Sequence, residues 1–417
     1  MTKTIIGIEG ELLPVKESAV ARVAVIGCGS HSFRNIFPTF QFLPIELVAL
    51  CDLNIEKANL YAKKFGATKV YSDYKKMLEK EKLDGVFLIL GFDDNTGKPL
   101  YPEVACEILN RGIPVWMEKP PSATVEEVQK MIASTKQGKT FAQVGFKKMF
   151  SPAIQKTKEL MQSKDFGKLS SFSIEYPIDV PANIWNLNDP AARRFLDDFV
   201  HVASTIIYLF GVPKETILFR TPDGGGIQVL LYESSVKGVI YLKKGASSYA
   251  PLERLEIVGN NANIILGNAI NLTFFTPANR GPYGRAIDYF PVYGDGPKSY
   301  FPEFSLGQLY NKGLFLEGYY QEIKNFVDCT INNQTPSIAN LDHALKVMQL
   351  YESFSNEPNK LAKLGVPIKE TRHTSSFEHQ YKCDKCKIRL VLKDGWNFKC
   401  TKCGKAYSYE QLLRTKK

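Results

Sequence analysis

The sequence has no run of apolar residues long enough to cross a membrane. Nowhere does it approach the roughly eighteen consecutive apolar residues that a transmembrane helix needs. Residues 1–14 also lack the charged start and apolar block of a signal peptide. Internal repeats and low-complexity tracts are absent. We therefore expect a cytoplasmic globular protein with no membrane partner, and 417 residues suffice for two or three domains.

Cysteine is also scarce, with eight residues in the whole chain. Four of them, Cys28, Cys51, Cys106 and Cys329, lie in apolar segments, and we expect them to be small buried thiols. Such usage fits the reducing cytoplasm better than an oxidising compartment.

The other four cysteines form two pairs near the end of the chain, Cys383 with Cys386 and Cys400 with Cys403. Each CxxC pair places two thiolates on one tight turn, and two such turns complete a tetrahedral metal site. The spacer reads as a hairpin, with a strand at 388–392, an Asp-Gly turn and a return strand at 396–399. The spacing predicts a structural zinc ribbon over 381–417, with iron as the alternative metal.

Positive charge is concentrated in this tail. The chain has a net charge of +10, and residues 371–417 carry twelve basic and four acidic residues. A basic ribbon could contact nucleic acid or an acidic partner. We favour the simpler interpretation, in which the lysines of the ribbon are merely solvated.

The N-terminal third begins with a strand, a glycine turn and a second strand that ends in an acid. Residues 22–26 and 46–51 are the strands, and Asp52 is the acid. The turn between them consists of Gly27, Cys28, Gly29, Ser30, His31 and Ser32. This arrangement is typical of dinucleotide binding, although Ser32 replaces the third glycine.

The chemistry of a dinucleotide accounts for these residue types. Gly27 permits the tight turn, and Gly29 lets the backbone approach the pyrophosphate. Asp52 would accept hydrogen bonds from the adenosine ribose and would repel a 2′-phosphate. NAD is therefore favoured as the cofactor, with NADP as the alternative because Asn54 and Lys57 lie nearby.

Strands and helices keep alternating up to about residue 150. Six strands with intervening helices predict a doubly wound parallel sheet, the Rossmann fold, over 21–150. Residues 151–370 carry two terminal helical stretches and closely spaced short strands, which predict an α+β domain with an open antiparallel sheet. Residues 1–20 form an extension with one strand at 4–8, and 371–380 form a linker to the ribbon.

Two further segments make a resemblance specific. Glu118-Lys119-Pro120 follows the fifth strand, and residues 144–152 follow the sixth. With the glycine turn and Asp52, they resemble the Gfo/Idh/MocA family of NAD(P)-dependent oxidoreductases over roughly residues 20–368. The resemblance implies that Glu118 and Lys119 border the cofactor, and that Lys119 lies beside both nicotinamide and substrate.

A helical segment supplies the second half of the resemblance. Leu196 to His201 is similar to the family motif Leu-Asp-x-Gly-x-His, which implies that Asp197 and His201 are a substrate-binding acid and a catalytic histidine. Their spacing of four places both on one helix face. Three positions depart from the family pattern: Phe199 replaces a glycine, Ser204 replaces an aspartate and Tyr101 replaces a histidine.

The residues favour hydride chemistry. Oxidation of an alcohol sends a hydride to nicotinamide and a proton to a base, for which His201 is suited, while Lys119 can stabilise alkoxide charge. The resemblance implies a sugar, cyclitol or nucleotide-sugar substrate and a homodimer or homotetramer. The alternative is a non-catalytic regulator that senses a dinucleotide or sugar and uses the basic ribbon to bind nucleic acid or protein.

Overall fold

The computed structural model divides the chain into two compact units, residues 1–365 and 366–417. The first unit is described over 19–221, 224–242, 253–277, 296–302 and 312–364, with the backbone of 5–6 and 12–13. The second is described at 383, 385–386, 390–394, 397–400 and 402–408.

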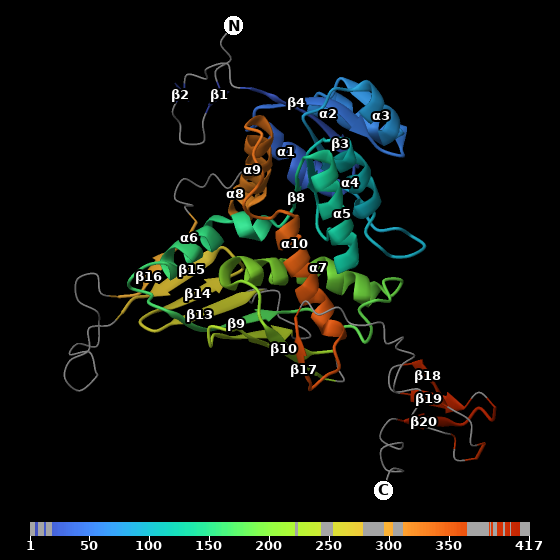
Figure 1. Ribbon diagram of the computed structural model, residues 1–417, viewed down its shortest axis with the longest axis vertical. Helices are drawn as coiled ribbons and strands as arrows, with labels where there is room; N and C mark the ends of the chain where they lie inside the picture. Colours follow the sequence, from blue (N-terminus) through green and yellow to red (C-terminus); the bar gives the residue numbers. More distant parts are fainter. Residues whose placement is uncertain are drawn as a thin grey trace. The chain divides into compact units, whose positions relative to one another are not determined.

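A six-stranded parallel sheet forms the N-terminal part of the first unit (Figure 1). Its strand order is β5-β4-β3-β6-β7-β8, and every neighbouring pair is parallel. The strands are β3 (Ala21–Ile26), β4 (Ile45–Cys51), β5 (Lys69–Tyr71), β6 (Gly85–Leu88), β7 (Val115–Met117) and β8 (Ala142–Val144). This order starts in the middle and runs outward in both directions, so the predicted Rossmann fold is confirmed.

Helices cover both faces of this sheet because its strands are apolar on both sides. Val23 and Val25 of β3 belong to one buried cluster, and Ala24 and Ile26 belong to the other. The covering helices are the π-helix η1 (Ser32–Ile36), α1 (Phe37–Phe40), α2 (Ile55–Phe65), α3 (Tyr74–Lys80), α4 (Tyr101–Asn110) and α5 (Val125–Gly138). The alternation along one strand follows from the two-residue period of side chains in β structure.

One helix of the Rossmann core comes from far along the chain. Helix α9 (Tyr319–Ile331) packs on the same face as α1 and α2. The ring of Phe326 lies 5.1 Å from that of Phe87 and 5.8 Å from that of Phe141. Gln143 of β8 is tied to this helix as well, since its Nε2 donates to the Glu322 carbonyl at 2.7 Å. The Rossmann domain is therefore completed by residues more than 170 positions beyond its last strand.

The second sheet has nine strands in the order β16-β15-β14-β13-β9-β12-β11-β10-β17. Its strands are β9 (Leu169–Tyr176), β10 (Glu215–Arg220), β11 (Gly226–Leu231), β12 (Lys237–Leu242), β13 (Arg254–Gly259), β14 (Asn263–Gly267), β15 (Asn271–Phe275), β16 (Lys298–Tyr300) and β17 (Leu361–Lys363). The pair β9 and β12 is parallel. The predicted α+β domain is confirmed, but the sheet is mixed and not wholly antiparallel.

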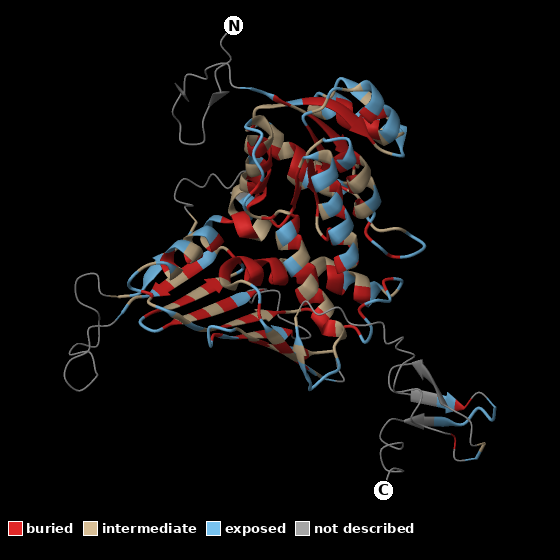
Figure 2. Cartoon of the chain, in the orientation of Figure 1, coloured by how far each residue is buried: buried red, intermediate tan, exposed pale blue. Residues whose placement is uncertain are grey.

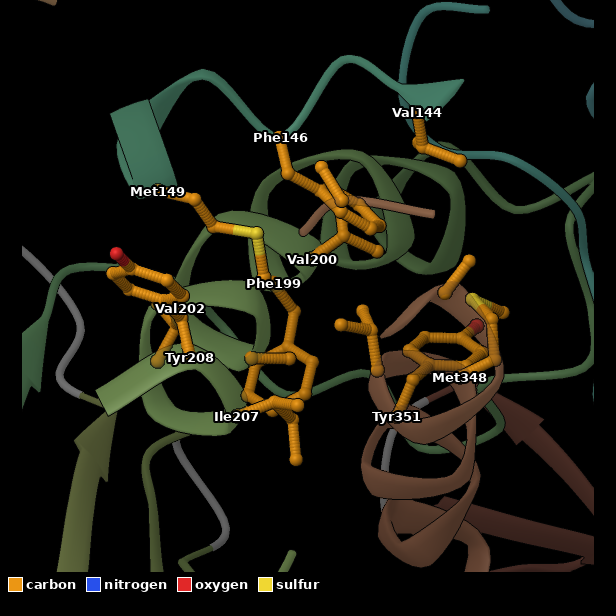
Figure 3. Packing of buried hydrophobic residues seen from close by; sticks show 14 of the residues in the cluster. Val144, Phe146, Met149, Phe199, Val200, Val202, Ile207, Tyr208, Met348 and Tyr351 are labelled. Atoms are coloured by element: carbon orange, nitrogen blue, oxygen red, sulfur yellow. The ribbon is translucent and has the colours of Figure 1, made fainter. Parts of the chain in front are cut away.

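Helix α7 (Pro190–Phe210) crosses one face of this sheet and is buried along most of its length (Figure 2). The other helical segments of this region are η2 (Lys147–Phe150), α6 (Pro152–Met161), α8 (Lys312–Leu316), α10 (Leu341–Glu352) and η3 (Ser353–Ser355). A single apolar cluster runs from β8 through α7 to α10, with Phe199 among its members (Figure 3). The Rossmann sheet and the second sheet therefore share one core.

Several local predictions need correction. The strand predicted at 4–8 is β1 (Ile5–Ile6), and it pairs with β2 (Leu12–Leu13). The first of the two terminal helical stretches predicted for 151–370 is divided at Gly318, whose φ is +93°. Much of the region between β15 and α8 lies outside the described residues, and its described part contains the short strand β16.

The tail contains a three-stranded antiparallel sheet of β18 (Leu390–Asp394), β19 (Asn397–Cys400) and β20 (Ala406–Ser408). Asp394 pairs with Asn397, so the chain reverses where the Asp-Gly turn was predicted. The linker at 371–380 lies outside the described residues. Within the described part of the chain, no helix combines the length and the apolar character that spanning a bilayer requires.

A buried carboxyl stands out in α9. Glu322 is 0% exposed, and neither of its carboxyl oxygens has a hydrogen-bond partner within the described residues. Burial, followed by the nearby charge of Glu118, raises the pKa of Glu322 well above its ordinary value of 4.5. The folded protein therefore keeps this proton to a higher pH than the unfolded chain does.

We predict that Glu322→Gln stabilises the protein at neutral pH. The folded wild type binds one more proton than the unfolded chain above pH 4.5, so its stability falls as pH rises through this range. Gln does not titrate, and the advantage of the variant should grow by about 1.4 kcal/mol per pH unit above that point. Urea unfolding between pH 4 and 8 measures it, with exposed Glu79→Gln as the control. An advantage that is independent of pH would contradict the prediction.

Candidate active site

The glycine turn is held by close backbone contacts at the carboxyl end of β3. Gly27 has φ +105°, and its N–H donates to the Cys51 carbonyl at 2.8 Å. A Cβ at this position would lie 2.1 Å from the Ile89 carbonyl oxygen. Only glycine permits both the positive φ and the close approach of these strand ends.

Gly29 differs from Gly27 because its surroundings are open. Apart from Gly29 itself and its two chain neighbours, no heavy atom lies within 4 Å of the position that its Cβ would occupy. Ser32, which replaces the third glycine of the motif, is buried, and its hydroxyl donates to the Gly27 carbonyl at 2.7 Å. Ser30 is exposed beside this space. The turn thus offers exposed backbone at the edge where a pyrophosphate group would fit.

Asp52 braces the turn from the end of β4. Its Oδ2 accepts a hydrogen bond from the Cys28 N–H at 2.8 Å, and its Oδ1 accepts one from the Asn54 N–H at 2.9 Å. Leu53, next in the chain, is 96% exposed and carries no charge. Lone pairs on the Asp52 carboxylate remain available to ribose hydroxyls.

Glu118 follows β7 and faces the glycine turn. It is 5% exposed, and its Oε1 lies 2.7 Å from Nε2 of His31. Its other oxygen accepts from the Lys119 N–H at 3.0 Å. His31 also contacts Asn35 through Nδ1 at 3.1 Å. The sequence predicts His31 as part of the cofactor-binding turn, but it gives no signal for a contact with Glu118, which lies 87 positions away.

Lys119 links the two sheets of the first unit. Its Nζ lies 2.8 Å from Oδ1 of Asp197 and donates to the Asp197 carbonyl at 3.2 Å. The lysine side chain is 15% exposed. The peptide bond between Lys119 and Pro120 is cis. The structure thus brings together two of the three residues predicted to be catalytic, one from the carboxyl edge of the parallel sheet and one from α7.

His201, the third of these residues, lies one helical turn after Asp197. Its Nδ1 is buried, with no hydrogen-bond partner in the described part of the chain. Burial lowers the pKa of His201 well below 6.5, and the charges of Lys119 and then Lys148 lower it further. The imidazole is therefore neutral at pH 7 and can accept a proton.

Two lysines beside this histidine were not assigned a role from sequence. Lys147 forms an ion pair with Glu317 and donates to the Tyr319 hydroxyl at 3.0 Å. Lys148 forms an ion pair with Glu253, a buried residue. Both lysines follow β8 in η2. The sequence signal that could have identified these two lysines is their position directly after the last parallel strand, because side chains at the carboxyl ends of strands converge on the cleft.

Tyr101, which stands where the family has a histidine, points into the protein. It is 2% exposed, and its hydroxyl donates to the Leu90 carbonyl at 2.6 Å. Burial, then the charge of Glu118, raises its pKa well above 10. The tyrosine therefore supports the loop after β6 through its hydroxyl.

A wide-open surface depression of about 260 Å³, called the cavity below, lies beside Asp197. It is lined by Phe92, Pro190, Arg193, Arg194 and Asp197. The cavity lies next to the ion pair with Lys119, so a small molecule bound there could reach both side chains.

Comparison with known proteins agrees with this geometry. The family model described as "Oxidoreductase family, NAD-binding Rossmann fold" (GFO_IDH_MocA) matches residues 21–146. The matched residues span the six strands of the Rossmann sheet. The enzyme is thus of the NAD(P)-dependent dehydrogenase type.

Full-length relatives share this class. A myo-inositol 2-dehydrogenase of Thermotoga maritima is 22% identical over 345 residues, which are 79% of this chain and 94% of the relative. The scyllo-inositol 2-dehydrogenase (NADP(+)) IolU of Bacillus subtilis is 24% identical over 257 residues, 59% of this chain and 75% of the relative. A solved levoglucosan dehydrogenase in complex with NADH and levoglucosan is 16% identical, covers 84% of this chain and 100% of that chain, and has a TM-score of 0.66.

The tail holds a second candidate site. The sulfur atoms of Cys383, Cys386, Cys400 and Cys403 all lie within 4.8 Å of one another. Those of Cys383 and Cys403 are 3.6 Å apart. Two of the four cysteines are buried. This convergence fits a tetrahedral metal centre, because a thiolate set of this size surrounds a single ion.

We predict that the two glycines of the turn fail in different ways when changed to alanine. Gly27→Ala should destabilise the fold by several kcal/mol, because the new Cβ meets the Ile89 carbonyl at a strained φ. Gly29→Ala should leave the melting temperature close to that of wild type but weaken NAD binding, because its Cβ occupies the open space. Thermal melts and calorimetric titration with NAD separate the two effects. Equal melting temperatures for the two variants would contradict this assignment.

Proposed function

We propose that the protein is an NAD-dependent dehydrogenase that acts on a CH–OH group of a sugar, cyclitol or nucleotide-sugar. The observation that carries this proposal is the contact between Lys119 and Asp197, at the carboxyl edge of the parallel strands and beside a cavity. The relatives named as inositol dehydrogenases support the substrate class.

His201, Lys119 and Asp197 have different roles in the proposed reaction. Oxidation of CH–OH removes a hydride from carbon and a proton from oxygen, and a bound nicotinamide supplies the hydride acceptor. His201 is neutral and accepts the proton. The ammonium of Lys119 stabilises the negative charge that develops on the substrate oxygen, and Asp197 holds that ammonium in place.

The glycine turn and Asp52 would hold the cofactor. The open space at Gly29 would accommodate the pyrophosphate, and Asp52 would accept hydrogen bonds from the ribose. We assign NAD in preference to NADP because Asp52 is anionic and the adjacent Leu53 provides no cation for a 2′-phosphate.

Lys119→Ala tests the proposal. We expect kcat to fall by about 10²- to 10³-fold, because one stabilising donor of the transition state is lost. NAD affinity, measured by calorimetry, should change far less than kcat. Lys75→Ala, which removes an exposed lysine of α3, is the matched control. Turnover of Lys119→Ala at the wild-type rate would reject the proposal.

The tail, we propose, is a zinc ribbon. The four converging sulfurs support this assignment, and tetrahedral sulfur sites of this size favour zinc or iron. Elemental analysis should give one zinc per chain, and Cys400→Ser should lose it. Cys106→Ser, a cysteine of the first unit, is the control and should keep the metal. A coloured protein that contains iron would refute the zinc assignment.

A homo-oligomer is proposed from the free face of the nine-stranded sheet. Phe219, Ile227 and Tyr241 lie opposite one another on β10, β11 and β12, and all three are exposed. A row of large apolar side chains across three strands is typical of an interface. A second copy of the chain is the occupant that the family resemblance favours.

Ile227→Lys should dissociate this oligomer, because it would bury a charge in the interface. Sedimentation velocity should show dimers or tetramers for wild type and a smaller species for the variant. Leu60→Lys, which changes an exposed leucine on α2, is the control and should keep the wild-type mass. A monomeric wild type at micromolar concentration would contradict the proposal.

A further inference from the structure

The cavity beside Asp197 has a cationic wall that the reaction does not require. Arg193 and Arg194 line it together with Phe92 and Pro190. We propose that this cavity binds an anionic oxygen group, a carboxylate or a phosphate, carried by the sugar substrate. This inference rests on the proposed function and deepens it, since it names the substrate as an acidic sugar.

Arg193 provides the main argument. Its side chain is half-buried, and its guanidinium has no hydrogen bond or ion pair with any other described residue. Every other arginine of the described chain has an acceptor. Arg22 pairs with Glu46, Arg34 with the Ser30 carbonyl, Arg111 with Glu107, Arg194 with Asp198, Arg220 with two carbonyls and Arg254 with Glu256. The Arg193 guanidinium is therefore not committed to an acceptor within the described protein and is available to pair with an anionic ligand.

The charges around the cavity also favour an anionic ligand. The residues that line the cavity include two arginines and one carboxylate, Asp197, whose Oδ1 is already bound by Lys119 at 2.8 Å. Arg194 is 77% exposed and contacts Asp198 at 3.5 Å, so this contact is easily exchanged for a ligand. The cavity therefore has excess positive charge, and an anionic group would neutralise it.

The shape and position suit a sugar acid. A guanidinium fork matches the paired oxygens of a carboxylate or phosphate. Phe92 and Pro190 provide an apolar wall for the CH face of a sugar ring. Because Asp197 lines the cavity and also holds Lys119, an anionic group at Arg193 would orient the remainder of the ring towards the reacting pair. The two arginines would then select among substrates without taking part in the hydride transfer.

The test compares neutral sugars with their acids. Glucose, galactose and mannose, their uronic acids and their 6-phosphates are titrated against the enzyme with NADH bound, and kcat/KM with NAD is measured for each. We expect an acid to bind more tightly than its neutral parent and to have the higher kcat/KM. Uronic acids distinguish a carboxylate site from a phosphate site.

Substitution assigns the preference to the arginine. Arg193→Gln should reduce the ratio of acid to neutral kcat/KM by about 10- to 100-fold, as expected for loss of a charge-assisted hydrogen bond. Arg193→Lys keeps the positive charge but lacks the forked guanidinium, so its ratio of acid to neutral kcat/KM should lie between those of wild type and Arg193→Gln. Arg111→Gln, which changes a surface arginine of α4, should keep the wild-type ratio. If Arg193→Gln does not fold by thermal melt, Arg194→Gln takes its place with the same expected direction.

The outcomes separate this inference from the proposed function. An enzyme that binds NADH and oxidises neutral sugars as well as their acids overturns the acidic-sugar inference and leaves the dehydrogenase proposal standing. An Arg193→Gln variant that keeps the wild-type ratio of acid to neutral kcat/KM also overturns the acidic-sugar inference and leaves the dehydrogenase proposal standing. Binding of acids that depends on Arg193, with no hydride transfer to NAD from any sugar, supports the anionic site and overturns the proposed reaction.

Discussion

The ion pair between Lys119 and Asp197 is the contact on which the candidate active site depends. Lys119 extends from the edge of the Rossmann sheet, and Asp197 belongs to α7, which packs on the other sheet. Successive helical residues are about 100° apart around the axis, so a shift of α7 by one residue would turn Asp197 away from the lysine. The packing of Phe195 and Phe199 against Phe354 fixes that rotation. The chemistry therefore depends on apolar residues that touch no ligand.

Much of the fold could be predicted because alternation of apolar strands and amphipathic helices is a local property. The strands predicted at 22–26 and 46–51 are β3 and β4, and each observed strand begins one residue earlier than predicted. The parallel pairing of β9 with β12 could not be predicted, because the two-residue period identifies a strand but not its neighbour. The packing of α9 on the Rossmann core was missed for a similar reason, since an amphipathic face does not reveal what it covers.

The candidate site, like the fold, could be predicted only in part from the sequence. Gly27, Asp52 and Lys119 could be located because each follows a strand that the sequence marks clearly, and side chains at such positions converge. The departures from the family pattern find local explanations. Phe199 fills the core where glycine is usual, and the Ser204 hydroxyl donates to the His201 carbonyl at 3.1 Å. The contact of Lys119 with Asp197 persists beside both replacements, which sequence comparison alone does not reveal.

The origin of α9 affects how the protein can be made. Phe326 fills the space between Phe87 and Phe141, so the sheet that would receive the dinucleotide stays unfinished while the ribosome is still adding residues 151–318. A nascent chain released before residue 331 would expose that apolar face to water and to other chains. The Rossmann sheet, although first in sequence, can thus close only after the strands from β9 to β16 have been synthesised.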